Sequence, residues 1–232
     1  MAYQGYNQFC PVAMTAEILG NRWTIVLMRE LCAGSTRFND LRRGVPRMSP
    51  ALLSKRLREL EHHGILERRP VRKSPEIQEY HLTEAGHDLG GVIMAIGFWG
   101  QRWIETSGSL DRADADLLMW DMRRNIVRDL FPPRRVTVQF RFPEAPRAWG
   151  TYWLLNDPDG VADLCKVDPG FDVDLFVRAD LRTMTAIWMG VEKVAAACDS
   201  GRLQLVGDRD LCDSIQSWLG LSPFAAEPKR VH

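Results

Sequence analysis

Basic side chains gather between residues 37 and 73, where eleven Lys or Arg stand against four Asp or Glu. Residues 50–63 have a helical pattern, and a helix turns about 100° per residue. Three side chains share one face, which must pack inward: Leu53, Leu57 and Leu60. The opposite face carries Ala51, Lys55, Arg58 and His62, with Leu52 and Glu59 at its edges. Small and cationic groups near a helix N-terminus suit the major groove of DNA. The alternative is an ordinary amphipathic helix with a solvated face.

The distribution of charge along the chain also indicates a nucleic-acid partner. The 30 basic and 30 acidic side chains of the 232 residues cancel, so the net charge indicates no partner. Residues 1–75, however, hold thirteen Lys or Arg against six Asp or Glu. Residues 76–129 hold five against ten, and residues 130–232 hold twelve against fourteen. A basic N-terminal segment followed by an acidic rest of the chain is typical of a protein whose nucleic-acid contact surface is confined to one domain.

The elements that would position these groups follow from cap and turn signals. Asn21 predicts a helix over Arg22–Cys32, and a short helix is expected over Arg37–Arg43. Ser49-Pro50, an N-cap followed by proline at the first helical position, starts the next helix, and Gly64 ends it. Ile65–Val71 and Ile77–Leu82 form two extended runs with a basic tip, and Thr83 caps a long helix to about Glu105. Helix, short turn, helix and basic hairpin is the order of a winged helix-turn-helix.

These residues also carry a family resemblance. The stretch from residue 10 to about residue 100 resembles the HxlR family of winged-helix transcription regulators, which are related to MarR. The resemblance rests on many spaced positions in order: Cys10-Pro11-Val12, Leu19-Gly20-Asn21-Arg22-Trp23-Thr24, Leu27-Met28-Arg29-Glu30-Leu31, Arg37-Phe38-Asn39-Asp40-Leu41, Ser49 to Leu60, Gly64 to Arg68, Glu79 to Thr83 and Gly86. It implies a homodimeric DNA-binding repressor or activator.

The resemblance also assigns roles. The groove-facing helix is Pro50–His63 and the wing is Arg68–Tyr80. Five residues are expected nearest the base edges: Ser49, Ala51, Leu52, Ser54 and Lys55. Four are expected at phosphates: Arg37, Arg58, Arg72 and Lys73. Phosphate contacts set register and salt dependence but carry no sequence information.

The helix Thr83–Glu105 contains small residues at Gly86, Gly90 and Gly97, and interior glycines cost about 1 kcal/mol each relative to alanine. Together with the apolar side chains Ile93, Ile96, Phe98, Trp99 and Trp103, they predict a dimer seam. The alternative is a loosely packed helix within one chain.

Cys10 is a candidate redox sensor, as a cysteine at this place is in some members of the family. The alternative is a small apolar residue packed under the dimer helices.

The second half has a different pattern. Alternation over Arg135–Phe142 predicts a half-buried strand, and further strands are expected over 149–156, 161–167 and 172–177. Helices are expected over Leu181–Met189, Glu192–Asp199 and Arg209–Leu219, with a short strand at Leu203–Val206. Strands first and helices after predict an α+β fold, an antiparallel sheet covered on one face. Asp114–Arg128 is expected to be a linker helix that ends before Pro132.

The segments Asp180-Leu181-Arg182-Thr183-Met184, Met189-Gly190, Gly201 to Asp208, Leu211 and Trp218-Leu219 resemble the sterol-carrier-protein-like fold, which often encloses an apolar cavity. The resemblance covers roughly residues 132–224. Four aromatic side chains are candidates to line an apolar ligand pocket: Phe140, Trp153, Trp188 and Trp218. Plain core packing of these aromatics is the alternative.

Other classes lack their motifs. The five cysteines (Cys10, Cys32, Cys165, Cys198 and Cys212) are scattered and show no metal-site or disulfide spacing. There is no His-Glu-x-x-His, phosphate-binding glycine loop or Gly-x-Ser-x-Gly, so we expect no enzyme, metal or cofactor. The longest apolar run, Leu89–Trp99, is much shorter than the roughly 20 residues of a membrane span. We therefore expect a cytoplasmic protein without a membrane partner.

The sequence thus predicts two domains: a winged helix-turn-helix over residues 1–106, a linker helix over 107–131, a sterol-carrier-like α+β domain over 132–224 and a frayed tail over 225–232. The expected function is a homodimeric regulator reading an inverted-repeat operator, with a C-terminal domain that senses an apolar ligand or only enlarges the dimer. The alternative is a carrier of hydrophobic ligands whose winged helix serves oligomerisation. An enzyme with a C-terminal pocket has no support.

Overall fold

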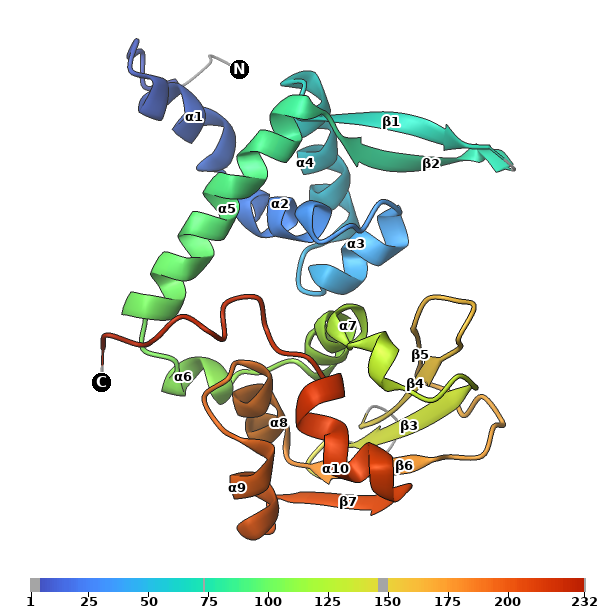
Figure 1. The fold of residues 1–232 in the computed structure, drawn as a ribbon. Coiled ribbons are helices and arrows are strands. Elements are labelled where there is room, and N and C mark those ends of the chain that lie inside the picture. Colours follow the sequence, from blue (N-terminus) through green and yellow to red (C-terminus); the bar gives the residue numbers. More distant parts are fainter. Residues whose placement is uncertain (1–4, 73, 146–149, 232) are drawn as a thin grey trace. The chain divides into compact units, whose positions relative to one another are not determined.

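A computed structural model describes residues 5–72, 74–145 and 150–231. The chain forms two compact units, residues 1–98 and residues 99–232 (Figure 1). Each unit has its own hydrophobic core.

The first unit begins with four helices: α1 (Pro11–Leu19), α2 (Thr24–Cys32), α3 (Phe38–Gly44) and α4 (Pro50–His62). The start of α4 confirms the capping prediction, because the Ser49 hydroxyl accepts a hydrogen bond from the Leu52 amide at 3.3 Å. Pro50 occupies the first turn, where its missing N–H costs nothing. Gly64 ends the helix with φ +68°, a conformation that favours glycine.

A hairpin follows, made of β1 (Leu66–Val71) and β2 (Ser74–Leu82). The strands are antiparallel, with Leu66 opposite Leu82 at the base (Figure 1). Thr83 then starts α5 (Glu84–Trp103): its hydroxyl accepts from the Gly86 amide and donates to the Gly64 carbonyl. The expected winged helix-turn-helix order is present.

The core of the first unit surrounds a buried carboxylate. Leu27, Met28, Leu41 and Leu53 of the packing helices are fully buried. Glu30 of α2 is also 0% exposed, and Ser35 donates to it at 2.6 Å. Arg29 lies 3.3 Å from its other oxygen.

Gly44, the last residue of α3, lies directly against this carboxylate. A Cβ at Gly44 would be 1.9 Å from the carboxyl carbon of Glu30 and within 2.4 Å of both its oxygens. The packing of α3 on α2 therefore depends on the absence of a side chain at position 44.

The second unit combines short helices with one sheet. Its helical elements are α6 (Ser107–Leu110), α7 (Ala115–Asn125), the 3-10 helix η1 (Arg128–Leu130), α8 (Leu181–Trp188), α9 (Val194–Asp199) and α10 (Arg209–Trp218). Its strands are β3 (Val136–Arg141), β4 (Thr151–Asn156), β5 (Asp163–Cys165), β6 (Leu175–Ala179) and β7 (Leu203–Gly207). Trp149, the expected first residue of the second strand, lies outside the described residues.

The sheet has the order β5-β4-β3-β6-β7 and is mixed. The prediction of an antiparallel sheet is wrong at one place, because β3 and β6 pair in parallel, with Val138 opposite Leu175. The other pairs are antiparallel. The chain leaves β5 at one edge and returns on the far side of β3, and this crossover sets β6 parallel to β3. Alternation within a strand cannot indicate such a crossover.

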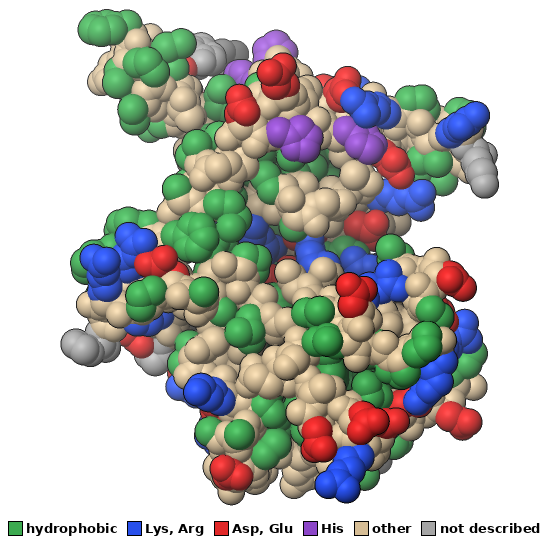
Figure 2. Space-filling view, in the orientation of Figure 1, with side chains coloured by type: hydrophobic (Ala, Val, Ile, Leu, Met, Phe, Trp, Pro, Cys, Tyr) green, Lys and Arg blue, Asp and Glu red, His purple; other side chains and the backbone are tan. Residues whose placement is uncertain are grey.

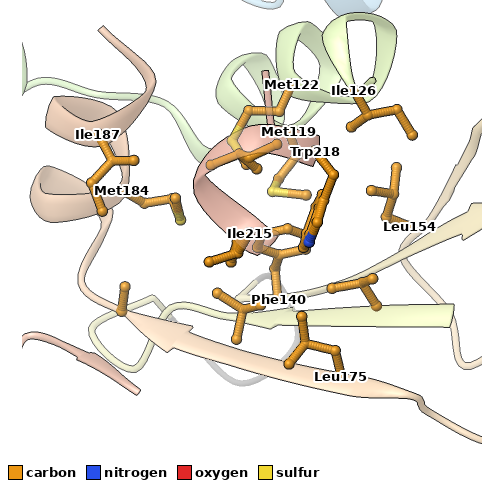
Figure 3. Packing of buried hydrophobic residues seen from close by; sticks show 14 of the residues in the cluster. Met119, Met122, Ile126, Phe140, Leu154, Leu175, Met184, Ile187, Ile215 and Trp218 are labelled. Carbon is orange, nitrogen blue, oxygen red and sulfur yellow. The ribbon is translucent and has the colours of Figure 1, made fainter. Parts of the chain in front are cut away.

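Helices and sheet share one core, shown in Figure 3. Phe140 and Leu154 of the sheet face Met119 and Met122 of α7 and Trp218 of α10. Trp218 is fully buried, and its indole nitrogen donates to the Leu211 carbonyl at 2.8 Å. The helix expected as a linker is therefore packed on the sheet as part of the second unit.

The expectation of a frayed tail is also wrong for residues 225–231, which pair with the end of α5. Glu227 and Arg102 form an ion pair at 2.6 Å. The Lys229 ammonium donates to the Ile104 carbonyl at 2.6 Å, and the Arg230 amide donates to the Arg102 carbonyl. Burial lowers the pKa of Lys229. Polar backbone contacts of this kind leave no hydrophobic pattern in a sequence.

Among the described residues, no helix has both the length and the apolar composition required to cross a bilayer.

Candidate nucleic-acid interface

Helix α4 has a buried and an exposed face, as its periodicity predicts. Leu53, Leu57 and Leu60 are at most 1% exposed, in the core of the first unit. The other face exposes Ala51, Lys55, Arg58 and His62, with Leu52 and Ser54 partly exposed. Ala51, Leu52 and Ser54 therefore precede the cations Lys55 and Arg58 along this face.

The two cations of this face differ in their partners. The Lys55 ammonium lies 3.9 Å from the Glu59 carboxylate one turn later, and the Lys55 side chain is 61% exposed. Arg58 is exposed and has no ion-pair partner within the described part of the chain. Exposed i,i+4 pairs contribute only about 0.3–0.5 kcal/mol, so Lys55 can exchange Glu59 for another acceptor at little cost.

Arg56 differs from Lys55 and Arg58 because it is buried and bonded within the first unit. It is 9% exposed and donates through Nε to the Arg22 carbonyl, in the turn between α1 and α2. Its Nη1 pairs with Glu59. Arg56 is thus a structural link within the first unit, on the inward side where helical periodicity places it.

The hairpin is attached to the helices by two ion pairs. Arg37 lies 3.1 Å from Glu79 of β2, and the neighbouring Tyr80 amide donates to the Thr36 carbonyl. The Arg37 guanidinium holds the pKa of Glu79 below its ordinary value. Arg68 of β1 pairs with Glu61 of α4 at 2.8 Å. The acidic partners were missed in the sequence, although Glu79 could have been found as a carboxylate at the base of a basic hairpin.

Arg72 lies exposed at the tip of the hairpin. Its predicted companion Lys73 lies outside the described residues. Figure 2 shows Lys and Arg side chains along the hairpin. Three residues expected to contact phosphates, Arg37, Arg58 and Arg72, therefore lie at the surface of the first unit. Arg37 is the one of the three that forms an ion pair within the described part of the chain.

A second exposed feature is apolar. Four side chains of α5 are 41–58% exposed at spacings of four, three and four residues: Val92, Ile96, Trp99 and Trp103. On α1, Val12 is 76% exposed and Met14 is 56% exposed, and Figure 2 shows hydrophobic side chains gathered over α1.

Of the expected seam residues on α5, Ile96, Trp99 and Trp103 lie in this stripe, and Gly97 and Phe98 are partly exposed. Ile93 is buried in the core. A Cβ at Gly86 would meet the Ile65 carbonyl oxygen at 2.1 Å, and one at Gly90 would lie 3.5 Å from the Cys32 sulfur. Gly86 thus accommodates a neighbour within the chain, whereas a Cβ at Gly90 would make only an ordinary van der Waals contact.

The remaining candidates are Cys10 and four aromatic side chains of the second unit. Cys10 is exposed and precedes α1 as its N-cap residue. Phe140, Trp188 and Trp218 belong to the core of the second unit, in which no more than 7% of any of them is exposed. Trp153 is 9% exposed and alternates with Tyr152 and Leu154 of that core, so it lies on the other face of the sheet. The structure thus brings three of the four aromatics together. No group of three His, Cys, Asp or Glu among the described residues is placed to hold a metal ion.

A helix pair with an exposed, cationic second helix and an attached basic hairpin defines a winged helix-turn-helix DNA-binding protein. The family model described as HxlR-like helix-turn-helix matches residues 18–108. The chain belongs to this family of MarR-like transcription regulators.

The chain is also similar to individual proteins. The uncharacterized HTH-type transcriptional regulator YdeP of Bacillus subtilis (strain 168) is 36% identical over 104 residues, which are 45% of this chain and 81% of YdeP. The uncharacterized regulator Rv3095 of Mycobacterium tuberculosis (strain H37Rv) is 41% identical over 40% of this chain and 58% of its own length. The solved structure of the redox regulator HypR in its reduced form is 32% identical, with 45% of this chain and 100% of that one aligned at a TM-score of 0.38. Both YdeP and Rv3095 are named as regulators of transcription.

Proposed function

We propose that this chain acts in the cytoplasm as a homodimer that binds an inverted-repeat operator through α4 and the β1–β2 hairpin. The observation that carries the proposal is the exposed face of α4, which presents uncharged side chains first and Lys55 and Arg58 next. A recognition helix with base-reading residues in its N-terminal part has this arrangement.

The proposal divides the surface into two groups. Residues at the start of α4 contact base edges: Ser49, Ala51, Leu52, Ser54 and Lys55. Residues around them contact phosphates: Arg37, Arg58, Arg72 and Lys73. Because the Ser49 oxygen already accepts the Leu52 amide, its hydroxyl hydrogen is the group available to a base or a phosphate.

The apolar stripe on α5 supports the dimer. Val92, Ile96, Trp99 and Trp103 follow one another at alternating spacings of four and three residues, which places side chains along a helix–helix seam. Exposed apolar patches of this kind mark interaction sites. A second copy of the same helix is the partner that would bring two α4 helices to one operator.

Footprinting of the full chain on the region upstream of its own coding sequence tests the proposal. We expect protection of two half-sites with centres about 34–36 Å apart. Protection of an asymmetric site by a monomer would contradict it.

Two substitutions separate the kinds of contact. Arg58→Ala should weaken binding to operator and random DNA alike and reduce the slope of log K against log salt by about 0.9. Lys55→Ala should cost about 1–3 kcal/mol on the operator only. The matched control is Arg209→Ala, which removes a 92% exposed arginine of α10 and should change neither quantity. Equal losses on both DNAs for Lys55→Ala would show that the helix is docked in another register.

For residues 132–224 we propose a sterol-carrier-like module that binds an apolar molecule and thereby changes operator affinity. Its support is the sheet covered by helices with aromatic side chains in their shared core. A hydrophobic compound that raises the melting temperature of the full chain should also shift its operator affinity. If such compounds bind and no operator exists, the alternative of a hydrophobic-ligand carrier holds. If no compound binds, the module only enlarges the protein.

A further inference from the structure

A hollow of about 190 Å³ lies within the first unit, between α1, the following turn, α2 and α4. Its walls are mostly polar. They are formed by Glu17, Ile18, Asn21, Thr24, Arg56, Glu59, Leu60 and His63.

Thr24 is the unusual member of this wall. It is 2% exposed, and its hydroxyl oxygen is buried without a hydrogen-bond partner. A buried hydroxyl normally has a partner, because leaving it unpaired costs the free energy of its lost hydration. The hollow that Thr24 lines is the place from which a partner could come.

The backbone beside Thr24 is strained as well. Trp23, the N-cap residue of α2, has φ +78° and ψ −17°, a left-handed conformation that a bulky side chain rarely adopts. Strain of this kind persists only where the surrounding structure enforces it, and it occurs often at ligand sites. Arg56 is one such restraint, since it donates to the carbonyl of Arg22, the residue before Trp23.

The polar side chains of the wall include both donors and acceptors, and the donor Arg56 is already paired. Arg56 already donates to the Arg22 carbonyl and to Glu59. The Asn21 amide nitrogen donates to the Glu17 carbonyl, so the amide oxygen of Asn21 is the group left to the hollow. The Glu17 carboxylate already accepts the Tyr6 amide at 2.6 Å. The Glu59 carboxylate, the Asn21 amide oxygen and the Thr24 hydroxyl therefore remain as acceptors, and they suit a ligand that donates hydrogen bonds and carries positive charge.

We propose that this hollow binds a small organic amine, with its ammonium group among Asn21, Thr24 and Glu59. The apolar side chains of Ile18 and Leu60 contact the carbon part of the ligand. The volume fits a molecule of the size of a single ring, below the roughly 300 Å³ at which drug-sized pockets begin.

The position of Glu59 gives the ligand a route to the DNA-contacting face. Glu59 pairs with Arg56 and lies 3.9 Å from Lys55. An ammonium bound at Glu59 competes with Lys55 for the carboxylate and frees Lys55 for another acceptor. This consequence rests on the proposed function, whereas amine binding itself does not.

Calorimetry on the full chain without DNA tests the site. The probes are benzylamine, benzyl alcohol and benzoate, which share a ring and differ in head group. We expect heat of binding and a raised melting temperature with benzylamine alone. Equal effects of all three probes, or no effect of benzylamine, would overturn the proposal.

Two substitutions localise the effect. Thr24→Val keeps the shape of the side chain and removes the hydroxyl, so it should weaken benzylamine binding roughly tenfold or more. It should leave the melting temperature of the free protein unchanged or raised, because the hydroxyl has no partner there. The matched control is Thr183→Val: Thr183 is equally buried, but its hydroxyl donates to Asp180 at 2.7 Å. The control should lower the melting temperature and leave benzylamine affinity unchanged.

Asn21→Asp tests the same site through an expected gain of benzylamine affinity. Asn21 is exposed, so this variant does not depend on changing the buried Thr24. It adds a carboxylate beside the hollow and should strengthen benzylamine binding several-fold, an effect that high salt should reduce. Unchanged benzylamine affinity in both Thr24→Val and Asn21→Asp would place the amine elsewhere and overturn the assignment.

Discussion

The contact between Gly44 and Glu30 predicts a large, specific coupling between two positions. Alanine normally stabilises a helix relative to glycine by about 1 kcal/mol. At Gly44, however, the added methyl group would overlap the buried Glu30 carboxylate, whose carbon lies 1.9 Å from the ideal Cβ position. Overpacking of this kind costs about 1–3 kcal/mol, and separation of the carboxylate from Arg29 and Ser35 raises the loss to about 3–5 kcal/mol.

The coupling between Gly44 and Glu30 can be measured in a double-mutant cycle. Gly44→Ala should destabilise the first unit in the native background and become neutral or stabilising once Glu30→Ala has removed the carboxylate. Glu30→Gln keeps the bulk of the side chain without its charge, so the loss caused by Gly44→Ala should persist there. The matched control is Gly91→Ala on α5, because a Cβ at Gly91 meets nothing within 4 Å and should stabilise the helix.

Hydrogen exchange read by mass spectrometry on peptides from α2 and α3 reports the first unit separately from the second. Faster exchange in Gly44→Ala, restored in the double variant, is the expected result. If Gly44→Ala has no effect, or the same effect in the native and Glu30→Ala backgrounds, the close contact does not determine how α3 packs.

Three further predictions concern the remaining features. Ile96→Glu on the apolar stripe should shift the chain from dimer to monomer in analytical ultracentrifugation without loss of helix content by circular dichroism. An NMR titration should find Glu79 protonated at a pH below the ordinary glutamate range, and Arg37→Ala should raise that midpoint. Since the folded-state pKa of Glu79 is lowered, the stability that this pair gives the hairpin is present at neutral pH and lost as pH falls through the lowered value. Trp218→Ala should destabilise the second unit by about 3–5 kcal/mol in urea-induced unfolding, because the side chain is fully buried.

Much of the first unit was predictable because its signals are local. The Ser49-Pro50 start, the leucines of α4 and the Thr83 cap each act within a few residues, so their geometry can be worked out from spacing alone. The exposed Lys55 and Arg58 follow from the same periodicity. These parts of the candidate interface needed no tertiary information.

The partners of these residues were not predictable, because they come from distant positions. Arg37 and Glu79 are 42 residues apart, and Arg56 lies 34 residues from the Arg22 carbonyl to which it donates. The parallel pairing of β3 with β6 depends on a crossover, and the unpartnered Thr24 hydroxyl depends on the absence of a neighbour. None of these leaves a periodic signal in the chain.

The pair between Arg37 and Glu79 affects how ion release on DNA binding should be interpreted. A free cation such as Arg58 displaces condensed counterions when it reaches a phosphate, and it contributes about 0.9 to the salt slope. Arg37 is paired with Glu79 beforehand, so moving Arg37 to a phosphate leaves the Glu79 carboxylate beside the His81 imidazole without its arginine. That carboxylate then takes up a cation from solution. The uptake cancels much of the release. The slope of log K against log salt will therefore indicate fewer phosphate contacts than the number of arginines and lysines that touch the DNA backbone. The difference measures how many of these side chains must break an ion pair with a carboxylate of the protein before they bind DNA.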